Sequence, residues 1–428
     1  MSRVPVVTSD QELFASISKM LNGCFEGCEA VYLDKASQAM DYLGVEMPEL
    51  VVINFADDKI DTDLLMNVIK GDSWLLSSSI IGLCESVREL RESEKLRSTN
   101  VISLVELARL ERQLPQVFNI ICHNRHMLFQ RVIGGDLGNV INTSFELKND
   151  LIEVNCFTNL ICNYLYNLNR IDIINKEKLS FVLTELLINA IEHGNCSISY
   201  GEKTTWLQNG GDMTELIDQR CKDPTIASRK VYLEYSIYPN HTKFSITDDG
   251  NGFDWRSLKD PSKGAVALSL HGRGVAISRD MTSDLTYNDK GNSVQFSFYH
   301  QEGVNNITPA LFKDLTTVKF AAGENVFNEG EPSDFLYFIS SGRYEVSVGG
   351  EAMTVLNQDD IFLGEMSFLL NNRRSASVKA VTNGALIRIS KKEFVAGIKE
   401  KPHYSLFLAR LLAQRIERLN HKLGHHHS

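Results

Sequence analysis

LSFVLTELLINAIEHGN, residues 179–195, is the stretch that decides the fold of the middle of the chain. Its apolar residues recur at helical spacing, at positions 179, 182, 183, 186, 187 and 190. Gly194 follows the run, and glycine readily ends a helix. Glu185 and Asn189 are four residues apart, so the predicted helix presents a carboxylate and an amide on one face.

Three later segments extend this candidate site. FSITDDGNGFD, residues 244–254, places Asp248 at the end of a predicted strand, followed by Gly250 and Gly252. LHGRGVAI, residues 270–277, is a glycine turn that opens a helix after Gly274, and GNSVQF, residues 291–296, is typical of a closing strand.

Each of these segments could bind one part of an ATP molecule. An asparagine oxygen on a helix can join a magnesium shell that phosphates and water complete. An aspartate at the mouth of a buried slot accepts a hydrogen bond from the adenine amino group. Glycines let the backbone approach the nucleotide, and a helix that opens at such a turn aims amide donors at phosphate. Each signal is weak alone, but their order and spacing are distinctive.

The combination resembles the GHKL ATP-binding superfamily, which includes gyrase and the histidine kinases, and within it the anti-sigma-factor serine kinases of partner-switching systems. The resemblance covers residues 142–302. It implies that Glu185 is the general base toward a substrate serine hydroxyl and that Asn189 binds Mg²⁺. The implied ATP-binding residues are Asn189, Asp248, Gly250, Gly252, Gly272, Arg273, Gly274 and Val275.

The chain departs from the superfamily pattern at two places. Residues 197–229 insert a polar stretch between the Asn189 helix and the next strand, and the pattern does not indicate its role. Asn292 follows Gly291 where the superfamily tends to have threonine. ATP binding survives either change more readily than catalysis does.

A histidine kinase is the obvious rival. Such enzymes carry a phospho-accepting histidine, followed by an acidic residue, on a helical hairpin of about 60 residues before the ATPase domain. The candidates here are His123 and His126, which Asn124 and Met127 follow, and too little chain separates them from Thr143 for two long helices. We therefore interpret residues 123–141 as a linker.

Residues 1–122 alternate short apolar runs with helical stretches. Continuous apolar strands separated by helices are typical of a parallel sheet covered on both faces. Five such units predict a flavodoxin-like α/β fold and resemble a response-regulator receiver domain. The predicted strands are 4–7, 31–33, 50–53, 80–83 and 101–104.

The chemistry of a receiver is missing from this domain. The acidic pair expected after the first strand is replaced by Thr8 and Ser9, with Asp10 next, and the phosphate-accepting aspartate is replaced by Asn54. Cys84 and Leu104 stand where the family has a hydroxyl residue and a lysine. Asp57 and Asp58 follow the third strand, and we interpret them as a solvated loop. The sequence predicts a pseudo-receiver, an interaction or dimerisation surface that takes no phosphate.

Residues 303–428 contain closely spaced short strands with glycine and proline between them, which predicts a small β jelly roll. Within them lies IFLGEMSFLLNNRRSASV, residues 361–378. Gly364 opens a short helix whose free amides can hold an anion, Glu365 stands beside it, and Arg374 follows nine residues later.

This segment resembles the phosphate-binding cassette of cyclic-nucleotide-binding domains. The resemblance implies that Arg374 pairs with the cyclic phosphate and that Glu365 accepts from the ribose 2′-hydroxyl. The implied site comprises Gly364, Glu365, Met366, Ser367, Arg374, Ser375 and Ala376. Ser375 suits cAMP or cGMP, so the base stays open. A helix over 403–420, with a stripe of Leu408, Leu412, Ile416 and Leu419, is either plain packing or the lid of the family.

Composition bounds these readings. The 428 residues suit two to four domains, and 43% hydrophobic with 23% charged residues is typical of a folded soluble chain. The net charge of −10 and a pI near 5.6 argue against an extended polyanion as ligand, and no helix-turn-helix segment follows residue 420.

The eight cysteines form no Cys-x-x-Cys pair, so we expect reduced thiols rather than a metal site. No apolar run of about 20 residues and no secretory signal is present, which indicates a cytoplasmic protein without membrane or DNA partners.

We therefore expect a multidomain, cytoplasmic, cyclic-nucleotide-responsive and ATP-dependent protein serine/threonine kinase. The expected substrate is a serine or threonine of an anti-sigma-factor antagonist, with a sigma factor or other regulator as competing partner, and the expected assembly is a homodimer. The expected ligands are ATP, Mg²⁺ and cAMP or cGMP. The alternative is a non-catalytic switch that binds both nucleotides and sequesters a partner.

Overall fold

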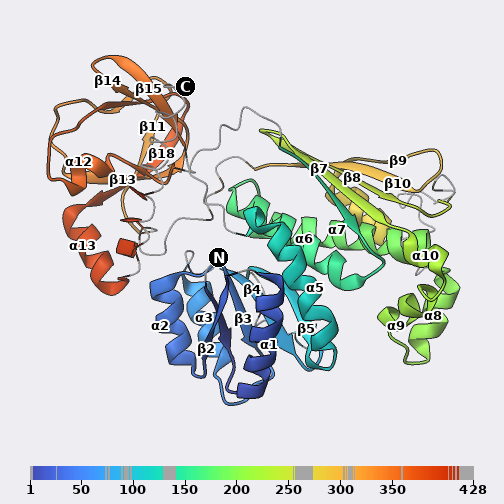
Figure 1. The fold of residues 1–428 in the computed structure, drawn as a ribbon. Helices are drawn as coiled ribbons and strands as arrows, with labels where there is room; N and C mark the ends of the chain where they lie inside the picture. Colours follow the sequence, from blue (N-terminus) through green and yellow to red (C-terminus); the bar gives the residue numbers. More distant parts are fainter. Residues whose placement is uncertain are drawn as a thin grey trace, which may run out of the picture.

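The structure of the chain is a computed structural model. It describes residues 3–25, 27–72, 75, 78–87, 90, 96, 99–128, 141–253, 255, 273–301, 304, 306, 312, 314–357, 360–402, 404–406, 408–409 and 412–413. Three groups of elements follow one another along the chain (Figure 1). Within the described residues, no helix combines the length and hydropathy that a bilayer crossing requires.

The first group, the N-terminal α/β domain, is a five-stranded parallel sheet in the order β2-β1-β3-β4-β5. All five residues of β3 are buried, because helices α1 and α5 cover one face of the sheet and α2 and α3 the other. This is the flavodoxin-like strand order, while the finer assignment as a receiver stays a prediction. The elements are β1 (Arg3–Val7), α1 (Gln11–Cys24), β2 (Glu29–Leu33), α2 (Ala36–Glu46), β3 (Leu50–Asn54), α3 (Thr62–Gly71), β4 (Ser79–Cys84), β5 (Val101–Glu106) and α5 (Leu110–His123).

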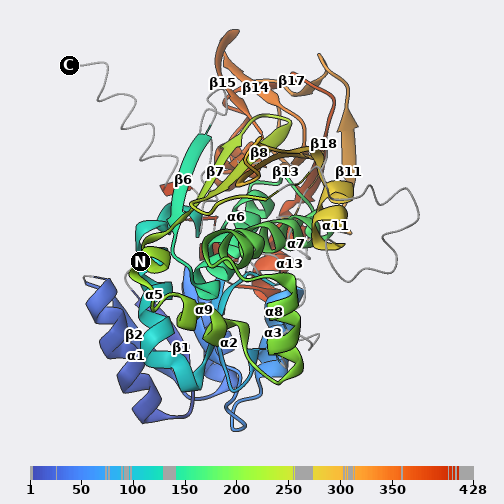
Figure 2. The ribbon, with the colours of Figure 1, turned by 90° about the vertical axis from the view of Figure 1, so that its right-hand side faces the viewer.

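The second group, the middle domain, has an antiparallel sheet in the order β6-β7-β8-β10-β9. Alternate residues of β7 are buried, and Figure 2 shows α6 and α7 side by side along one face of this sheet. Its elements are β6 (Ile141–Leu147), α6 (Leu151–Asn167), α7 (Ile173–Asn189), α8 (Tyr200–Gln208), α9 (Met213–Arg220), α10 (Pro224–Ser228), β7 (Val231–Ile237), β8 (His241–Asp248), α11 (Arg273–Met281), β9 (Ser283–Tyr287) and β10 (Ser293–Tyr299).

The first two domains share one hydrophobic core. Ile102 of β5 and Phe118 of α5 belong to the same buried cluster as Leu160 of α6. The buried Lys176 of α7 donates from Nζ to the carbonyl of Thr99, at 3.0 Å, and to the side chain of Asn100. The middle domain is therefore packed onto the edge of the parallel sheet rather than tethered to it by chain alone.

The segment interpreted as a linker begins as ordered structure. His123 is the last residue of α5, and His126 lies in a 3-10 turn, Arg125–Met127. Met127 and Leu128 are buried in the shared core. The rest of the predicted linker, residues 129–140, lies outside the described residues.

The third group, the C-terminal β domain, packs two antiparallel four-stranded sheets, β11-β18-β13-β16 and β12-β17-β14-β15. This β-sandwich agrees with the predicted small β domain. Its elements are β11 (Thr317–Phe320), β12 (Asn325–Phe327), β13 (Phe335–Ser341), β14 (Tyr344–Val348), β15 (Glu351–Leu356), β16 (Phe362–Leu363), α12 (Glu365–Leu369), β17 (Ser377–Ala380), β18 (Gly384–Ser390) and α13 (Lys391–Glu400).

The segment after α13 joins this domain to the first one. Tyr404 and Leu408 are buried in the C-terminal core, and Leu412 packs against it, while Ile416 and Leu419 lie outside the described residues. Lys401 Nζ lies 2.9 Å from the buried carboxylate of Asp72, which follows α3. The predicted lid helix is thus packed on its own domain and anchored to the N-terminal α/β domain.

Candidate nucleotide-binding sites

Glu185 and Asn189, the first two candidate residues, both lie on helix α7. Asp172 caps its N-terminus by accepting a hydrogen bond from the amide of Asn175. The apolar stripe faces the core, which leaves Glu185 and Asn189 half-buried on the opposite side. Neither side chain makes a hydrogen bond to another residue of the described chain. Within the described residues, nothing in the protein therefore competes with a ligand for either group.

The helix does not stop at Gly194 as predicted. It continues as a π-helical segment, Ala190–Asn195, in which the amide of Cys196 donates to the carbonyl of Ile191 at 2.8 Å. Such widened turns are rare and often mark functional sites. The segment carries His193 and Gly194 to the end of β8.

Asp248 is the last residue of β8 and is only 8% exposed. Burial raises the pKa of its carboxyl group to about 6, against the opposing effect of a hydrogen bond from the Gly250 amide, 2.9 Å away. Asn292 holds the backbone of Asp248 from both sides: its side chain donates to the Asp248 carbonyl at 2.7 Å, and its carbonyl accepts from the Asp248 amide. Asn292, which stands where the superfamily tends to have threonine, thus positions the backbone of Asp248.

Two glycines make the close approach of Asp248 to the π-helical segment possible. A Cβ at Gly194 would lie 2.5 Å from Cγ of Asp248, and one at Gly250 would lie 2.3 Å from the carbonyl oxygen of Gly194. Real Cβ contacts of this length do not occur, so both positions exclude a side chain unless the site opens. Gly252 has a positive φ of 76°, and a Cβ added there would lie 2.0 Å from the carbonyl oxygen of Lys290. An internal contact therefore accounts for Gly252, and its predicted role toward a nucleotide stays a prediction.

Helix α11 closes the site over Glu185. It begins at Arg273, so Gly274 is its second residue rather than the residue before the helix, as predicted. A Cβ at Gly274 would lie 2.0 Å from Oε2 of Glu185, which places the carboxylate directly against the first turn of α11. Val275 is buried, and Gly272 lies outside the described residues.

Sequence reasoning missed an aromatic group beside the site. The His193 ring centroid is 4.0 Å from that of Tyr200, the first residue of α8. Burial, and then the charges of Glu185 and Glu192, raise the pKa of Tyr200, so this phenol lies within electrostatic reach of the candidate base. Tyr200 belongs to the insertion, and only its proximity in space to Glu185 indicates a role.

The donor set fits Mg²⁺ bound through a nucleotide. No cluster of three or more histidine, cysteine or acidic residues that could hold a metal is found in the described ranges. The amide oxygen of Asn189 has no partner among the described residues, and one such oxygen is enough for a magnesium ion when phosphates and water supply the other ligands.

The second candidate site lies in the C-terminal β domain. Gly364, at φ 74°, is the residue that precedes α12, and Arg374 is 4% exposed behind it. The guanidinium of Arg374 donates to the carbonyls of Gly364, at 3.0 Å, and Phe335, and lies 4.1 Å from the ring centroid of Phe327. Its Nε is buried without a hydrogen-bond partner among the described atoms. The guanidinium is thus held by backbone carbonyls, with one buried donor left unpaired.

The other predicted residues of this site surround the arginine. Glu365 and Ser367 are buried, and the Ser367 hydroxyl accepts from Arg374 at 3.3 Å. Burial lowers the pKa of Arg374, whereas neighbouring Glu365 is among the groups that raise it. Met366 and Ser375 are exposed and Ala376 is half-buried at the rim. The structure therefore gathers the predicted set around one short helix.

The N-terminal α/β domain shows a different arrangement from the one predicted at Asp57. This carboxylate is not a solvated loop group: it accepts hydrogen bonds from the Ser9 amide, the Ser9 and Thr8 hydroxyls, and the Lys59 amide. Burial raises its pKa, but these four donors outweigh burial and hold the pKa below its ordinary value. Asn54 joins the cluster through a 3.2 Å hydrogen bond to Thr8. An internal carboxylate fills the place where a receiver has its acidic pocket.

Comparison with known families agrees with two of the three domains. Residues 163–298 match the histidine kinase-like ATPase domain, and residues 317–401 match the cyclic nucleotide-binding domain. The chain thus carries a GHKL-type ATPase domain followed by a cyclic-nucleotide-binding domain. Neither match reaches the N-terminal α/β domain.

Among curated proteins, a CRP-like cAMP-activated global transcriptional regulator of Mycobacterium tuberculosis is 35% identical over 122 residues, 27% of this chain and 53% of that one. A cGMP-dependent protein kinase of Plasmodium berghei is 33% identical over 91 residues, 21% of this chain and 10% of that one. The solved Catabolite Activator Protein of Thermus thermophilus shares 26% identity, covering 27% of this chain and 55% of that one, at a TM-score of 0.25. This chain thus spans about half the length of the Mycobacterium regulator.

Proposed function

We propose that the protein is a protein serine/threonine kinase of the partner-switching type, which uses ATP and is regulated by a cyclic nucleotide. The observation that carries the proposal is the pairing of Glu185 with Asn189 on α7. Both side chains are half-buried, and neither is engaged by another described residue. Asp248 packs against Gly194, which belongs to the π-helical segment that continues α7 after Asn189.

Each side chain has one step in this proposal. Asp248, buried and pinned by Asn292, accepts a hydrogen bond from the adenine amino group and selects the base. Asn189 would hold Mg²⁺, which neutralises phosphate charge when bound. Glu185 takes the proton of a serine or threonine hydroxyl. Its carboxylate lies against the first turn of α11, so α11 fixes the direction in which it faces.

The C-terminal domain is proposed to supply regulation. Arg374 would exchange its contacts with the Gly364 and Phe335 carbonyls for charge-assisted hydrogen bonds to a cyclic phosphate. Because the segment around Lys401 and Tyr404 joins this domain to Asp72, a change at Arg374 can reach the N-terminal α/β domain. The printed names of the relatives include a cAMP-activated and a cGMP-dependent protein, so both ligands need testing.

The experiment follows radiolabelled phosphate from γ-labelled ATP to a cognate antagonist protein. Wild type is compared with Glu185→Gln, and Glu177→Gln, an exposed glutamate on the same helix, is the matched control. We expect label on the antagonist in wild type and in the control, and a loss of at least about a hundredfold in Glu185→Gln. Label that is absent, or equal in all three, contradicts the kinase proposal.

The same gel separates the two rival functions. A phosphoserine ester survives acid treatment, whereas a phosphohistidine bond does not, so acid-labile label on the protein itself would indicate a histidine kinase. ATP binding without any transfer would indicate the non-catalytic switch. The uncommitted carboxylate of Glu185 favours the serine/threonine kinase over that switch, because a mere binding site has no use for a base beside the Asn189 amide.

A further inference from the structure

We propose that the helical insertion, residues 197–229, is a brace through which the N-terminal α/β domain controls the geometry of the ATP site. The proposal rests on the ATP site described above and adds its regulation. One end of the brace is bound to α5, and the other end contacts the residues that directly follow Asn189.

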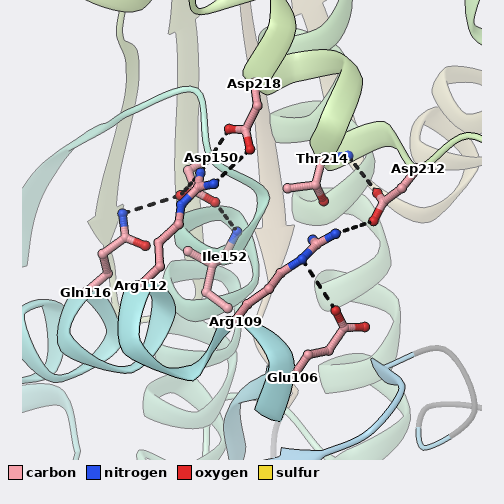
Figure 3. A network of polar contacts seen from close by, with 9 residues as sticks. All are labelled: Glu106, Arg109, Arg112, Gln116, Asp150, Ile152, Asp212, Thr214 and Asp218. Atoms are coloured by element: carbon pink, nitrogen blue, oxygen red, sulfur yellow. Dashed lines mark hydrogen bonds and ion pairs between the residues drawn. The ribbon is translucent and has the colours of Figure 1, made fainter.

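At the α5 end, two arginines bind carboxylates of the insertion (Figure 3). Arg112 donates two hydrogen bonds to Asp218 of α9, at 2.8 and 2.9 Å, and Arg109 lies 2.9 Å from Asp212. Asp212 also caps the N-terminus of α9 by accepting from the Thr214 amide. A movement of α5 therefore acts directly on the start of α9.

The network includes the middle domain itself. Arg112 also lies 3.9 Å from Asp150, which caps α6 through a 3.0 Å hydrogen bond from the Ile152 amide. The side chain of Arg112 is 54% exposed, and exposed ion pairs add little to stability. The value of a bidentate arginine at this place is the fixed orientation of three elements, α5, α6 and α9.

Within the insertion, α8 and α9 are tied to each other. Arg220 of α9 pairs with Glu202 of α8. The indole of Trp206 donates to the carbonyl of Asp212 at 2.8 Å, and a Cβ at Gly211 would lie 2.3 Å from that indole nitrogen. The two helices therefore form a compact pair that transmits displacement instead of absorbing it.

At the ATP end, α8 holds the π-helical segment. Lys203 Nζ lies 2.5 Å from the carboxylate of Glu192, which is only 2% exposed. A carboxylate this deeply buried needs its cation, so loss of Lys203 would leave a buried charge unpaired and displace Glu192. Tyr200 packs on His193, and Glu185 contributes to the raised pKa of Tyr200. Displacing α8 would thus disturb both the Gly194–Asp248 contact and the surroundings of the base.

A charge swap tests the brace in the full chain. The variants are Arg112→Glu, Asp218→Arg and the two combined, with Mg²⁺-ATP binding measured by calorimetry and folding followed by thermal melting. Arg3→Glu is the matched control, because Arg3 has a similar exposure, 56%, and its partner Glu29 lies on the β2 edge of the sheet. We expect each single change to weaken ATP binding about fivefold or more, the double change to restore it, and the control to leave it unchanged.

Several outcomes would overturn the brace. Single variants that bind ATP like wild type refute it, and so does a double variant that fails to recover. If wild type itself binds no Mg²⁺-ATP, the proposed function fails instead, so the two failures are distinguishable. Lys203→Met gives a second route that leaves α5 intact, and it too must weaken ATP binding. Since coupling is reciprocal, ATP must also slow amide hydrogen exchange in α9 of wild type, and unchanged exchange counts against the brace.

Discussion

Replacing Asp248 by asparagine should stabilise the protein while it destroys ATP binding. Burial raises the pKa of this carboxyl from 3.8 to about 6, which corresponds to about 3 kcal/mol. A raised pKa means that the folded state holds the proton more tightly, so the contribution of Asp248 to stability is complete below pH 3.8 and is lost as the pH rises through 6. Above that pH the folded protein carries a buried charge that asparagine would not.

The assay is unfolding of wild type and Asp248→Asn at pH 8 and at pH 4. Asparagine keeps an oxygen for the Gly250 amide, so we expect a gain of about 2–3 kcal/mol at pH 8 that shrinks toward zero at pH 4. Asp58→Asn, at an exposed position of the N-terminal α/β domain far from Asp248, is the control and should show no such gain. A variant that is less stable than wild type at pH 8, or whose gain is independent of pH, would refute the assignment of Asp248 as a buried, destabilising ligand group.

Three further predictions concern the individual sites. Gly194→Ala should weaken ATP binding by about ten- to a hundredfold in calorimetry, because the new methyl group displaces the Asp248 carboxylate by about 1 Å, whereas Gly201→Ala, with nothing within 4 Å, should bind normally. Arg374→Ala should abolish the heat of cyclic-nucleotide binding, and Arg373→Ala, at an exposed position, should retain it; equal heats in both would contradict the site. Acetyl phosphate should leave no adduct on Asp57 in mass spectra, since four donors already occupy that carboxylate, and a stable adduct would show the domain to be a working receiver.

Local sequence patterns were sufficient for most of the elements. Continuous apolar runs such as Leu50–Asn54 predicted buried parallel strands, and the stripe on residues 179–190 predicted the helix that carries Glu185 and Asn189. The cassette around Gly364 also folds as predicted, with Arg374 behind a short helix. Each of these features depends on residues close together in the chain.

The features that could not be predicted depend on residues far apart in the sequence. The π-helical segment, residues 190–195, is bound by residues outside the local pattern: the Asp249 amide donates to Asn195, and Lys203 pairs with Glu192. No local pattern around Asn292 predicts that its amide donates to the backbone of Asp248, 44 positions away. Asp57 looked solvated because the Thr8 and Ser9 hydroxyls that bind it belong to another strand end.

The most direct test of the account is the rate of phosphoryl transfer from ATP to a cognate antagonist, measured on the full chain with and without cAMP and cGMP. One cyclic nucleotide should change the rate at least severalfold in wild type, and this response should vanish in Arg374→Ala while basal transfer persists. A transfer rate that neither nucleotide alters, or a response that survives in Arg374→Ala, would contradict a kinase regulated through the C-terminal domain.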